Sequence, residues 1–149
     1  MKIYRVSATK YAADITGEGA RLYGGRWNNP LTSCIYSSES RALAILEYMV
    51  NVNIKEIPRA LSIVTFNIAD NKVKEILLEN VPSNWATMPA PNSTKDMGTA
   101  LLKQYPILKL PSVVIGLEYN FVINPFAATA ALQIVNVQDL VYDVRIKQS

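Results

Sequence analysis

The sequence has 149 residues, of which 50% are hydrophobic and 18% are charged, and its basic excess gives a net charge of +3. This composition is typical of a globular protein and excludes a disordered chain. The absence of histidine and the single cysteine, Cys34, exclude His-dependent catalytic triads, most zinc sites and an internal disulfide.

The charge pattern and the hydrophobic pattern restrict partners and location. Lysines and arginines are scattered, which fits an anionic small molecule better than direct binding to nucleic acid. No apolar run reaches the roughly 18 residues that a membrane-spanning helix needs. The residues after Met1-Lys2 are too few and too polar for a signal peptide. We therefore expect a cytoplasmic protein with no membrane partner.

The first part of the chain predicts two strands joined by an unusual loop. Residues 2–7 (KIYRVS) and 33–38 (SCIYSS) have the composition of short strands. Between them, residues 20–30 (ARLYGGRWNNP) fit neither a helix nor a strand. The glycine pair allows close approach to the backbone, and the arginine fork suits phosphate or carboxylate. This loop favours the binding of an anion and of a flat group.

Residues 38–52 (SESRALAILEYMVNV) contain the best helix pattern in the sequence. Serines at its start can cap free amide groups. Leu43, Leu46 and Val50 recur at helical spacing and predict the inward face. Glu47 lies about 40° from Leu43 on a helical wheel, at the edge of this apolar stripe.

The remainder predicts four more strands and one more helix. Residues 60–68 alternate as a strand does, 109–125 contain two strands around a turn near Gly116, and 134–146 close the chain with further strand. A shorter helix is expected at 93–104. Because strands and helices do not alternate regularly, we expect an α+β fold, a mixed sheet with flanking helices, in a single compact domain over residues 1–149.

Glu47 and Arg26 together point to an anion-binding cleft. A carboxylate at the border of a buried face must be paired, hydrogen-bonded or part of a cleft. Two plainer interpretations stay open at this point: Glu47 reaches solvent at the stripe's border, and Arg26 stacks on Trp27 as a surface cap. The residues alone do not name a reaction.

Three ordered motifs resemble the RES-domain family, the toxin half of bacterial RES–Xre toxin–antitoxin modules. They are GEGARLYGGRWNNP, IYSSESRALAILEYMV and LPSVVIGLEYNFVINP. The resemblance puts the family's arginine, glutamate and serine on Arg26, Glu47 and Ser112, and its active-site tyrosine on Tyr36. The family often carries a histidine after the NP pair, where this chain has phenylalanine after Asn124-Pro125.

The resemblance implies an ADP-ribosyltransferase-like fold and the cleavage of the nicotinamide–ribose bond of NAD⁺ by water or inorganic phosphate. NAD⁺ would be a substrate, with neither a resident cofactor nor a metal. The implied partner is a cognate Xre-type helix-turn-helix antitoxin that blocks the active site, and a homodimer is compatible with the family. The alternatives are ADP-ribose transfer to a host protein and, from another class, an RNA-targeting toxin or nucleic-acid-binding module.

The family match assigns a role to each motif residue. Glu47 would stabilise the cationic ribose of the transition state, and Arg26 would bind the pyrophosphate. Tyr36 would offer an aromatic face to nicotinamide; without the family it is a half-buried strand tyrosine. Ser112 would orient Glu47 or a ribose hydroxyl; otherwise it is a serine at the start of a strand.

Neighbouring residues complete the expected substrate-binding set. Arg5 either joins Arg26 in binding or is a structural ion-pair partner. Trp27 and Asn28 are expected to line the site beside Arg26.

Three other polar residues are expected to be structural. Asn120 and Asn124 would fix turn backbone. Cys34 would be inert core packing.

Overall fold

Alternating and helical patterns in the sequence become seven strands and three α-helices in the computed structural model, which describes residues 1–147. The strands are β1 (Lys2–Ala8), β2 (Ile35–Ser38), β3 (Leu61–Ile68), β4 (Val73–Glu75), β5 (Ile107–Pro111), β6 (Tyr119–Ile123) and β7 (Leu132–Leu140). The helices are α1 (Glu18–Tyr23), α2 (Arg41–Asn51) and α3 (Asn92–Gln104).

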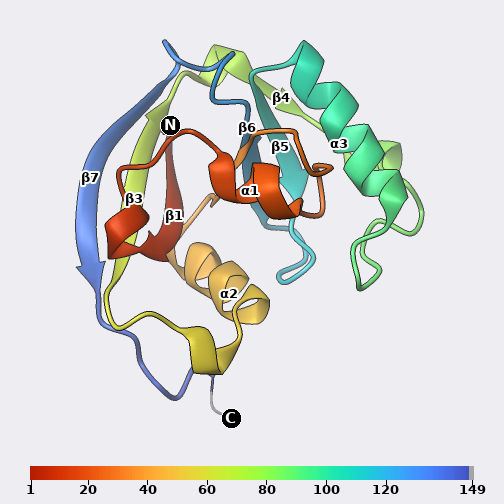
Figure 1. The fold of residues 1–149 in the computed structure, drawn as a ribbon. Helices are drawn as coiled ribbons and strands as arrows, with labels where there is room; N and C mark the ends of the chain where they lie inside the picture. Colours follow the sequence, from red (N-terminus) through yellow and green to blue (C-terminus); the bar gives the residue numbers. More distant parts are fainter. Residues whose placement is uncertain (148–149) are drawn as a thin grey trace.

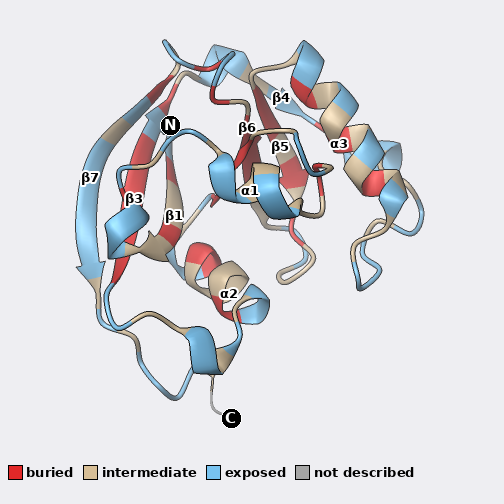
Figure 2. Cartoon of the chain, viewed as in Figure 1, coloured by how far each residue is buried: buried red, intermediate tan, exposed pale blue. Residues whose placement is uncertain are grey.

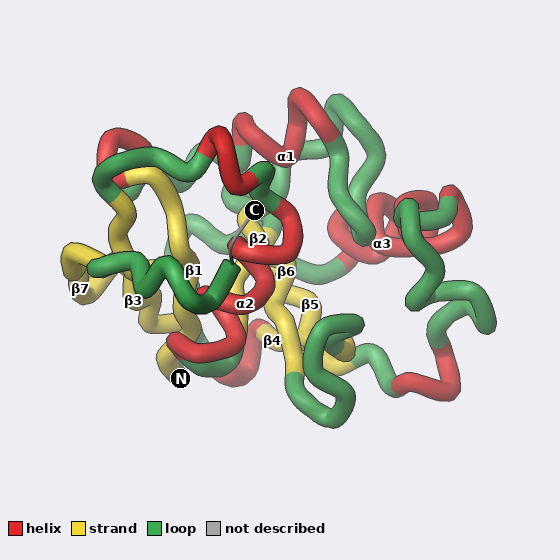
Figure 3. The backbone as a smooth tube through the Cα atoms, turned by 90° about the horizontal axis from the view of Figure 1, so that it is seen from below, coloured by secondary structure: helices red, strands yellow, loops and turns green. Residues whose placement is uncertain are grey.

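All seven strands belong to one mixed sheet in the order β4-β5-β6-β2-β1-β3-β7. Figure 1 shows β7, β3 and β1 on one side of the molecule and β6, β5 and β4 on the other. Only β4 and β5 run parallel; the other pairs are antiparallel. β1 and β2 pair through Tyr4 and Ser38, so the sheet is weakly joined there. Seen from below, β1, β3 and β7 form one group, and β2, β4, β5 and β6 form the other (Figure 3).

The main core lies between these two groups of strands. One cluster of buried side chains draws Ile3 and Phe66 from the first group and Ile35, Phe121 and Ile123 from the second. Because successive side chains in a strand point to opposite faces, one face of each group packs into this core and the other remains for helices. The edge strand β7 is largely exposed (Figure 2).

Helices α2 and α3 cover the outer faces. Ala44 of α2 packs with Val6 of β1 and Ile63 of β3, while Leu102 of α3 packs with Leu108 of β5. The predicted α+β class with a mixed sheet and flanking helices in one compact domain is confirmed. The last two residues of the predicted domain, 148 and 149, lie outside the described residues.

Helix α1 was not expected, because residues 20–30 had no helical pattern. Gly17 and Gly24 flank α1 with φ of 73° and 70°, a region that glycine adopts without strain. An ion pair joins Arg21 to Glu18 at 2.8 Å, one turn apart. Two glycines and one local ion pair therefore delimit a helix too short for its periodicity to be visible.

Two further predictions were wrong, one on the inward face of α2 and one on the end of the last strand. Val50 is 56% exposed, and the buried residues of α2 are Leu43, Ala44 and Met49. β7 ends at Leu140, so the expected strand at 134–146 is shortened.

Within residues 1–147 no helix combines the length and apolar character that crossing a bilayer requires.

Candidate active site

Glu47 is held at the junction of α2 with β5 and β6. Leu43 and Ala44, one turn earlier, are buried, so Glu47 projects from the same side of the helix toward the sheet. Its Oε1 accepts hydrogen bonds from Ser112 Oγ at 2.8 Å and from Asn120 Nδ2 at 2.6 Å. The interpretation that Glu47 is hydrogen-bonded is therefore confirmed.

Ser112 is the residue after β5, at the end of a strand and not at its start as expected. It is 2% exposed. Its Oγ accepts the backbone N–H groups of Val114 and Ile115, each at 3.1 Å. With both acceptor positions used, the single hydroxyl hydrogen is directed to Glu47.

Asn120 belongs to β6, so the expectation that it fixes turn backbone is wrong. It lies opposite Ser38 of β2 in the sheet register. Ser38 Oγ donates to Asn120 Oδ1 at 2.6 Å. We call Ser38, Glu47, Ser112 and Asn120 the Glu47 cluster. Sequence reasoning missed Ser38 and Asn120, although a polar residue on a strand face shared with apolar neighbours was a detectable signal.

The second carboxylate oxygen of Glu47 has no hydrogen-bond partner among residues 1–147. In the part of the chain that the structure describes, both donors reach Oε1 and none reaches Oε2. The side chain is half-buried. A fixed carboxylate with one open oxygen can accept a ligand hydroxyl or stabilise a nearby cation.

Arg26 reaches the loop before α3. Its Nη1 donates to the carbonyls of Trp85 and Thr87 at 2.7 and 2.9 Å, and its Nη2 lies 2.6 Å from Met88 Sδ. Partial burial lowers the pKa of Arg26, and the charge of Glu47 opposes that shift. Arg26 thus faces the loop and lies within the electrostatic reach of Glu47.

Trp27 is 3% exposed and packs in the core between α3 and the sheet. The interpretation of Arg26 and Trp27 as a stacked surface cap is therefore wrong. A β-carbon at Gly98 of α3 would lie 1.9 Å from Trp27 O, so this helix approaches the loop closely.

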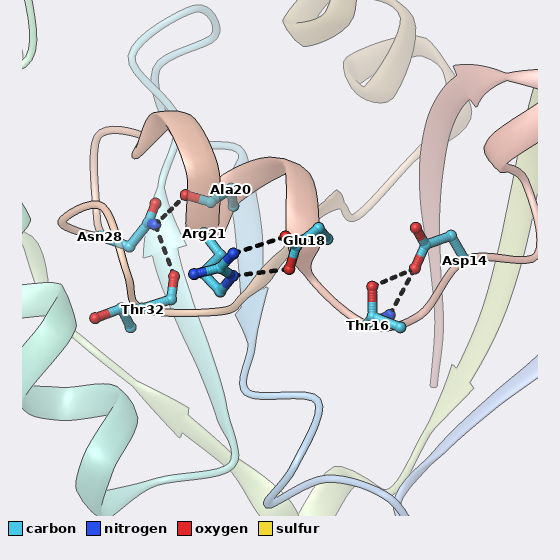
Figure 4. Close-up of polar contacts among 7 residues, drawn as sticks. All are labelled: Asp14, Thr16, Glu18, Ala20, Arg21, Asn28 and Thr32. Carbon is cyan, nitrogen blue, oxygen red and sulfur yellow. Dashed lines mark hydrogen bonds and ion pairs between the residues drawn. The ribbon is translucent and has the colours of Figure 1, made fainter.

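Tyr36 and Asn28 form a second polar cluster, which we call the Asn28 cluster. It lies beneath the loop that carries Arg26. Tyr36 Oη accepts from Trp27 N at 3.0 Å and donates to Asn28 Oδ1 at 2.7 Å. Asn28 Nδ2 donates to the carbonyls of Ala20 and Thr32 at 2.9 and 3.0 Å (Figure 4).

Close packing surrounds this second cluster. Burial, above all, raises the pKa of Tyr36 well above its ordinary value. A β-carbon at Gly25 would lie 2.6 Å from Tyr36 Oη, so the glycine lets the loop approach the ring. Asn28 is fully buried and holds the loop that carries Arg26. Direct contact of Trp27 or Asn28 with a substrate stays a prediction.

Arg5 and Tyr36 line a cavity of about 610 Å³ between β1, α1 and β2. Arg5 Nη2 donates to Ala12 O at 3.0 Å, and its guanidinium lies 5.2 Å from the centre of the Phe66 ring. Its Nε is buried without a hydrogen-bond partner among residues 1–147. Burial lowers the pKa of Arg5, and the charge of Asp14 opposes this shift.

The cavity's acidic residues are engaged elsewhere. Asp14 accepts both hydrogen bonds of Thr16, and Glu18 pairs with Arg21 (Figure 4). None of the ion pairs within the described chain involves Arg5, so the structure does not support the ion-pair alternative.

Two of the expected structural roles are confirmed. Asn124 Oδ1 accepts from the backbone N–H groups of Phe126 and Ala127, and so fixes a turn. Cys34 is 2% exposed, and burial raises the pKa of its thiol to about 12.

The predicted site residues thus fall into three groups. Glu47 and Ser112 are in direct contact. Arg26 precedes Trp27, whose backbone N–H donates to Tyr36 Oη, and Arg5 lines the same cavity as Tyr36.

A model of the RES domain matches residues 2–145. The chain belongs to the RES domain family. The resemblance carried by its three motifs is confirmed.

Relatives in the RES family cover nearly the whole chain. Toxin Res of Yersinia enterocolitica is 33% identical over 99% of this chain and 100% of its own length. A Prs ADP-ribosylating toxin of Sphingobium sp. is 31% identical over 93% of this chain and 89% of its own length. This RES-family member is therefore a homologue of bacterial toxins.

A solved structure shares the fold. The crystal structure of the M. tuberculosis MbcT–MbcA toxin–antitoxin complex contains a chain that matches with a TM-score of 0.76 and 21% identity. The match covers 93% of this chain and 83% of that one.

Proposed function

We propose that this chain is a RES toxin that depletes NAD⁺ by cleaving its nicotinamide–ribose bond. The observation that carries the proposal is Glu47, with Oε1 held by two donors and Oε2 open. The charge of Arg26 lies within its electrostatic reach. A carboxylate on helix α2 and a guanidinium on a loop that is fixed by hydrogen bonds can bind the two ends of a nicotinamide mononucleotide unit.

The reaction needs a fixed negative group and little else. As the C1′–N bond breaks, its electron pair leaves with neutral nicotinamide, and positive charge develops on the ribose. Glu47 would stabilise that charge and accept a ribose hydroxyl on Oε2, as carboxylates do in glycoside hydrolysis. Water attacking C1′ gives ADP-ribose and a proton, and inorganic phosphate gives ADP-ribose 1″-phosphate. A loose, cationic transition state accepts such weak nucleophiles without a strong general base.

The remaining residues would hold the substrate. Arg26 keeps Nε and part of Nη2 for the pyrophosphate while Nη1 holds the loop. Arg5 lines the cavity, and the part of its guanidinium that faces the cavity is a second candidate for a phosphate oxygen. Tyr36 is among the residues that line that cavity, and its ring would offer nicotinamide a surface. NAD⁺ is then a substrate, and neither a cofactor nor a metal takes part.

ADP-ribose transfer to a protein is the second candidate. It is favoured by the 31% identity to a relative named as a Prs ADP-ribosylating toxin. The same Glu47 would serve both reactions, because bond cleavage is common to them and only the acceptor differs.

We further propose that the toxin acts in the cytoplasm and is neutralised by an Xre-type helix-turn-helix antitoxin that covers the site. Support comes from the shared fold with a protein solved as a toxin–antitoxin complex. An excess of purified antitoxin should stop turnover; undiminished turnover in the saturated complex would contradict a blocked site.

The decisive experiment incubates the purified chain with NAD⁺, with and without phosphate, and follows nicotinamide by chromatography. Release by wild type and loss in Glu47→Gln support the proposal, and a phosphate requirement identifies the acceptor. Release only when lysate protein becomes labelled from NAD⁺ would favour ADP-ribose transfer. No release under any of these conditions would overturn both.

A further inference from the structure

We propose that Asn120, held by Ser38, is the positioning residue that fixes Glu47 and turns its Oε2 toward the substrate. This inference rests on the proposed function. Ser38 lies on β2, Asn120 on β6 and Glu47 on α2. Three elements thus meet in one chain of hydrogen bonds.

The orientation of the Asn120 amide is determined by its neighbours. An ionised carboxylate only accepts hydrogen bonds, so the atom 2.6 Å from Glu47 Oε1 must be the amide nitrogen. The amide oxygen then faces Ser38 Oγ at 2.6 Å and receives its hydroxyl hydrogen. A reversed amide would set two acceptors against each other at Glu47.

The sheet makes this arrangement rigid. Asn120 pairs with Ser38 on one side and with Leu110 of β5 on the other. Ser38 and Leu110 are 3% and 0% exposed, so the strand around Asn120 has no room to shift. A donor on an exposed loop would not hold a carboxylate to the accuracy that catalysis requires.

Ser112 and Asn120 have complementary tasks at the same oxygen. Both donate to Oε1. Together they prevent the carboxylate from rotating so that Oε1 and Oε2 exchange places. Ser112 approaches from the end of β5, and Asn120 from within β6. Loss of Asn120 would let Oε2 turn inward and occupy the vacated donor position.

The test compares Asn120→Ala and Asn120→Asp with wild type, with Asn136→Ala as the matched control. Asn136 is an exposed asparagine on the edge strand β7. In Asn120→Ala, kcat for nicotinamide release should fall about 10- to 100-fold, as expected for loss of a hydrogen bond to a charged group. KM for NAD⁺ should change less than about threefold, because the substrate contacts remain. Asn136→Ala should match wild type in both constants.

Asn120→Asp separates positioning from a structural role. Near pH 8 the new carboxylate repels Glu47, so kcat should fall further than in Asn120→Ala. As the pH is lowered toward about 5, protonation restores a donor, and kcat relative to wild type should rise. Asn120→Ala should show no such recovery. Because Asn120→Asp keeps the side-chain shape, this comparison stands even where Asn120→Ala folds poorly.

Unchanged kcat in Asn120→Ala, or an effect confined to KM, would overturn the positioning role while wild-type activity keeps the proposed function. An Asn120→Asp variant without pH-dependent recovery would also overturn it. Absence of nicotinamide release by wild type would overturn the proposed function and this role with it.

Discussion

The Glu47 cluster and the Asn28 cluster are both polar networks on the helix side of the second strand group, yet they differ in what they leave open. In the Asn28 cluster, Asn28 uses its amide nitrogen on three carbonyls and its oxygen on Tyr36. In the Glu47 cluster, both donors converge on Oε1 and leave Oε2 without a partner within residues 1–147.

This contrast distinguishes a hydrogen-bond network that stabilises the fold from one that can bind a ligand. A saturated network stabilises a loop and leaves no free hydrogen-bonding group for a ligand. A network that fixes one atom of a carboxylate and leaves the other open is prepared for a second molecule. Substitutions in the two clusters should therefore differ in kind: those in the Glu47 cluster should lower activity, and those in the Asn28 cluster should lower stability.

Glu47→Gln should abolish most activity while the fold remains. It keeps the side-chain shape and removes the negative charge, so nicotinamide release should fall about a thousandfold. Chromatographic assay gives the rate, and circular dichroism reports the fold. A variant that keeps more than about a tenth of wild-type turnover would contradict the role of the carboxylate.

Asn28→Ala should instead affect stability. It leaves the Ala20 and Thr32 carbonyls and the Tyr36 hydroxyl without Asn28, so the free energy of unfolding should fall by about 3 kcal/mol. Urea denaturation measures the change. Asn29→Ala, which removes only an exposed hydrogen bond to Asp96, is the control and should cost less than about 0.5 kcal/mol. Equal costs in the two variants would refute the structural assignment.

Arg26→Lys tests a residue that holds the loop before α3 and is proposed to bind the substrate. Lysine keeps the charge and cannot reproduce the fork that reaches the carbonyls of Trp85 and Thr87. KM for NAD⁺ should rise about 20-fold. Limited proteolysis should also cut the loop that contains Trp85 and Thr87 faster than in wild type. Arg59→Lys, at an exposed position, should leave both measurements unchanged. An unaltered KM would remove Arg26 from substrate binding.

Ser112→Ala should lower kcat about tenfold, because Glu47 Oε1 keeps its bond from Asn120. Ser83→Ala is the control of the same chemical change, since Ser83 is an exposed serine outside the Glu47 cluster, and it should keep wild-type turnover. Steady-state kinetics at saturating NAD⁺ distinguishes the two. Equal turnover in both variants would leave Ser112 as a residue of the turn alone.

The smallest effect at neutral pH concerns Cys34. Its thiol has a pKa raised from 9.0 to about 12 by burial, so the folded state keeps the proton that the unfolded state loses. Stability is therefore fully present below about pH 9 and declines as the pH rises from about 9 to about 12. Urea denaturation across this range checks the slope against Cys34→Ala. Identical slopes would show that the thiol does not titrate differently on folding.

Sequence patterns predicted a helix or strand well where the element is long or where apolar and polar residues alternate. The spacing of apolar residues placed α2 and α3, alternation placed β3, and strand-like composition placed β1 and β6, to within a few residues. Glu47 was recognisable as an unusual charge on a buried face before its partners were known. Helix α1 was not predictable, because its ends depend on two left-handed glycines and not on periodicity.

Three ordered motifs were enough to identify the family and the residue types that the proposed chemistry requires. Which polar groups meet depends on the packing of distant segments. Ser38, Asn120 and Ser112 lie 65 to 82 residues from the partners that they bind, and no local pattern encodes such a contact. The pairing of β2 with β6 and the packing of α2 bring them together. That convergence holds one oxygen of Glu47 and leaves the other without a partner in the described part of the chain.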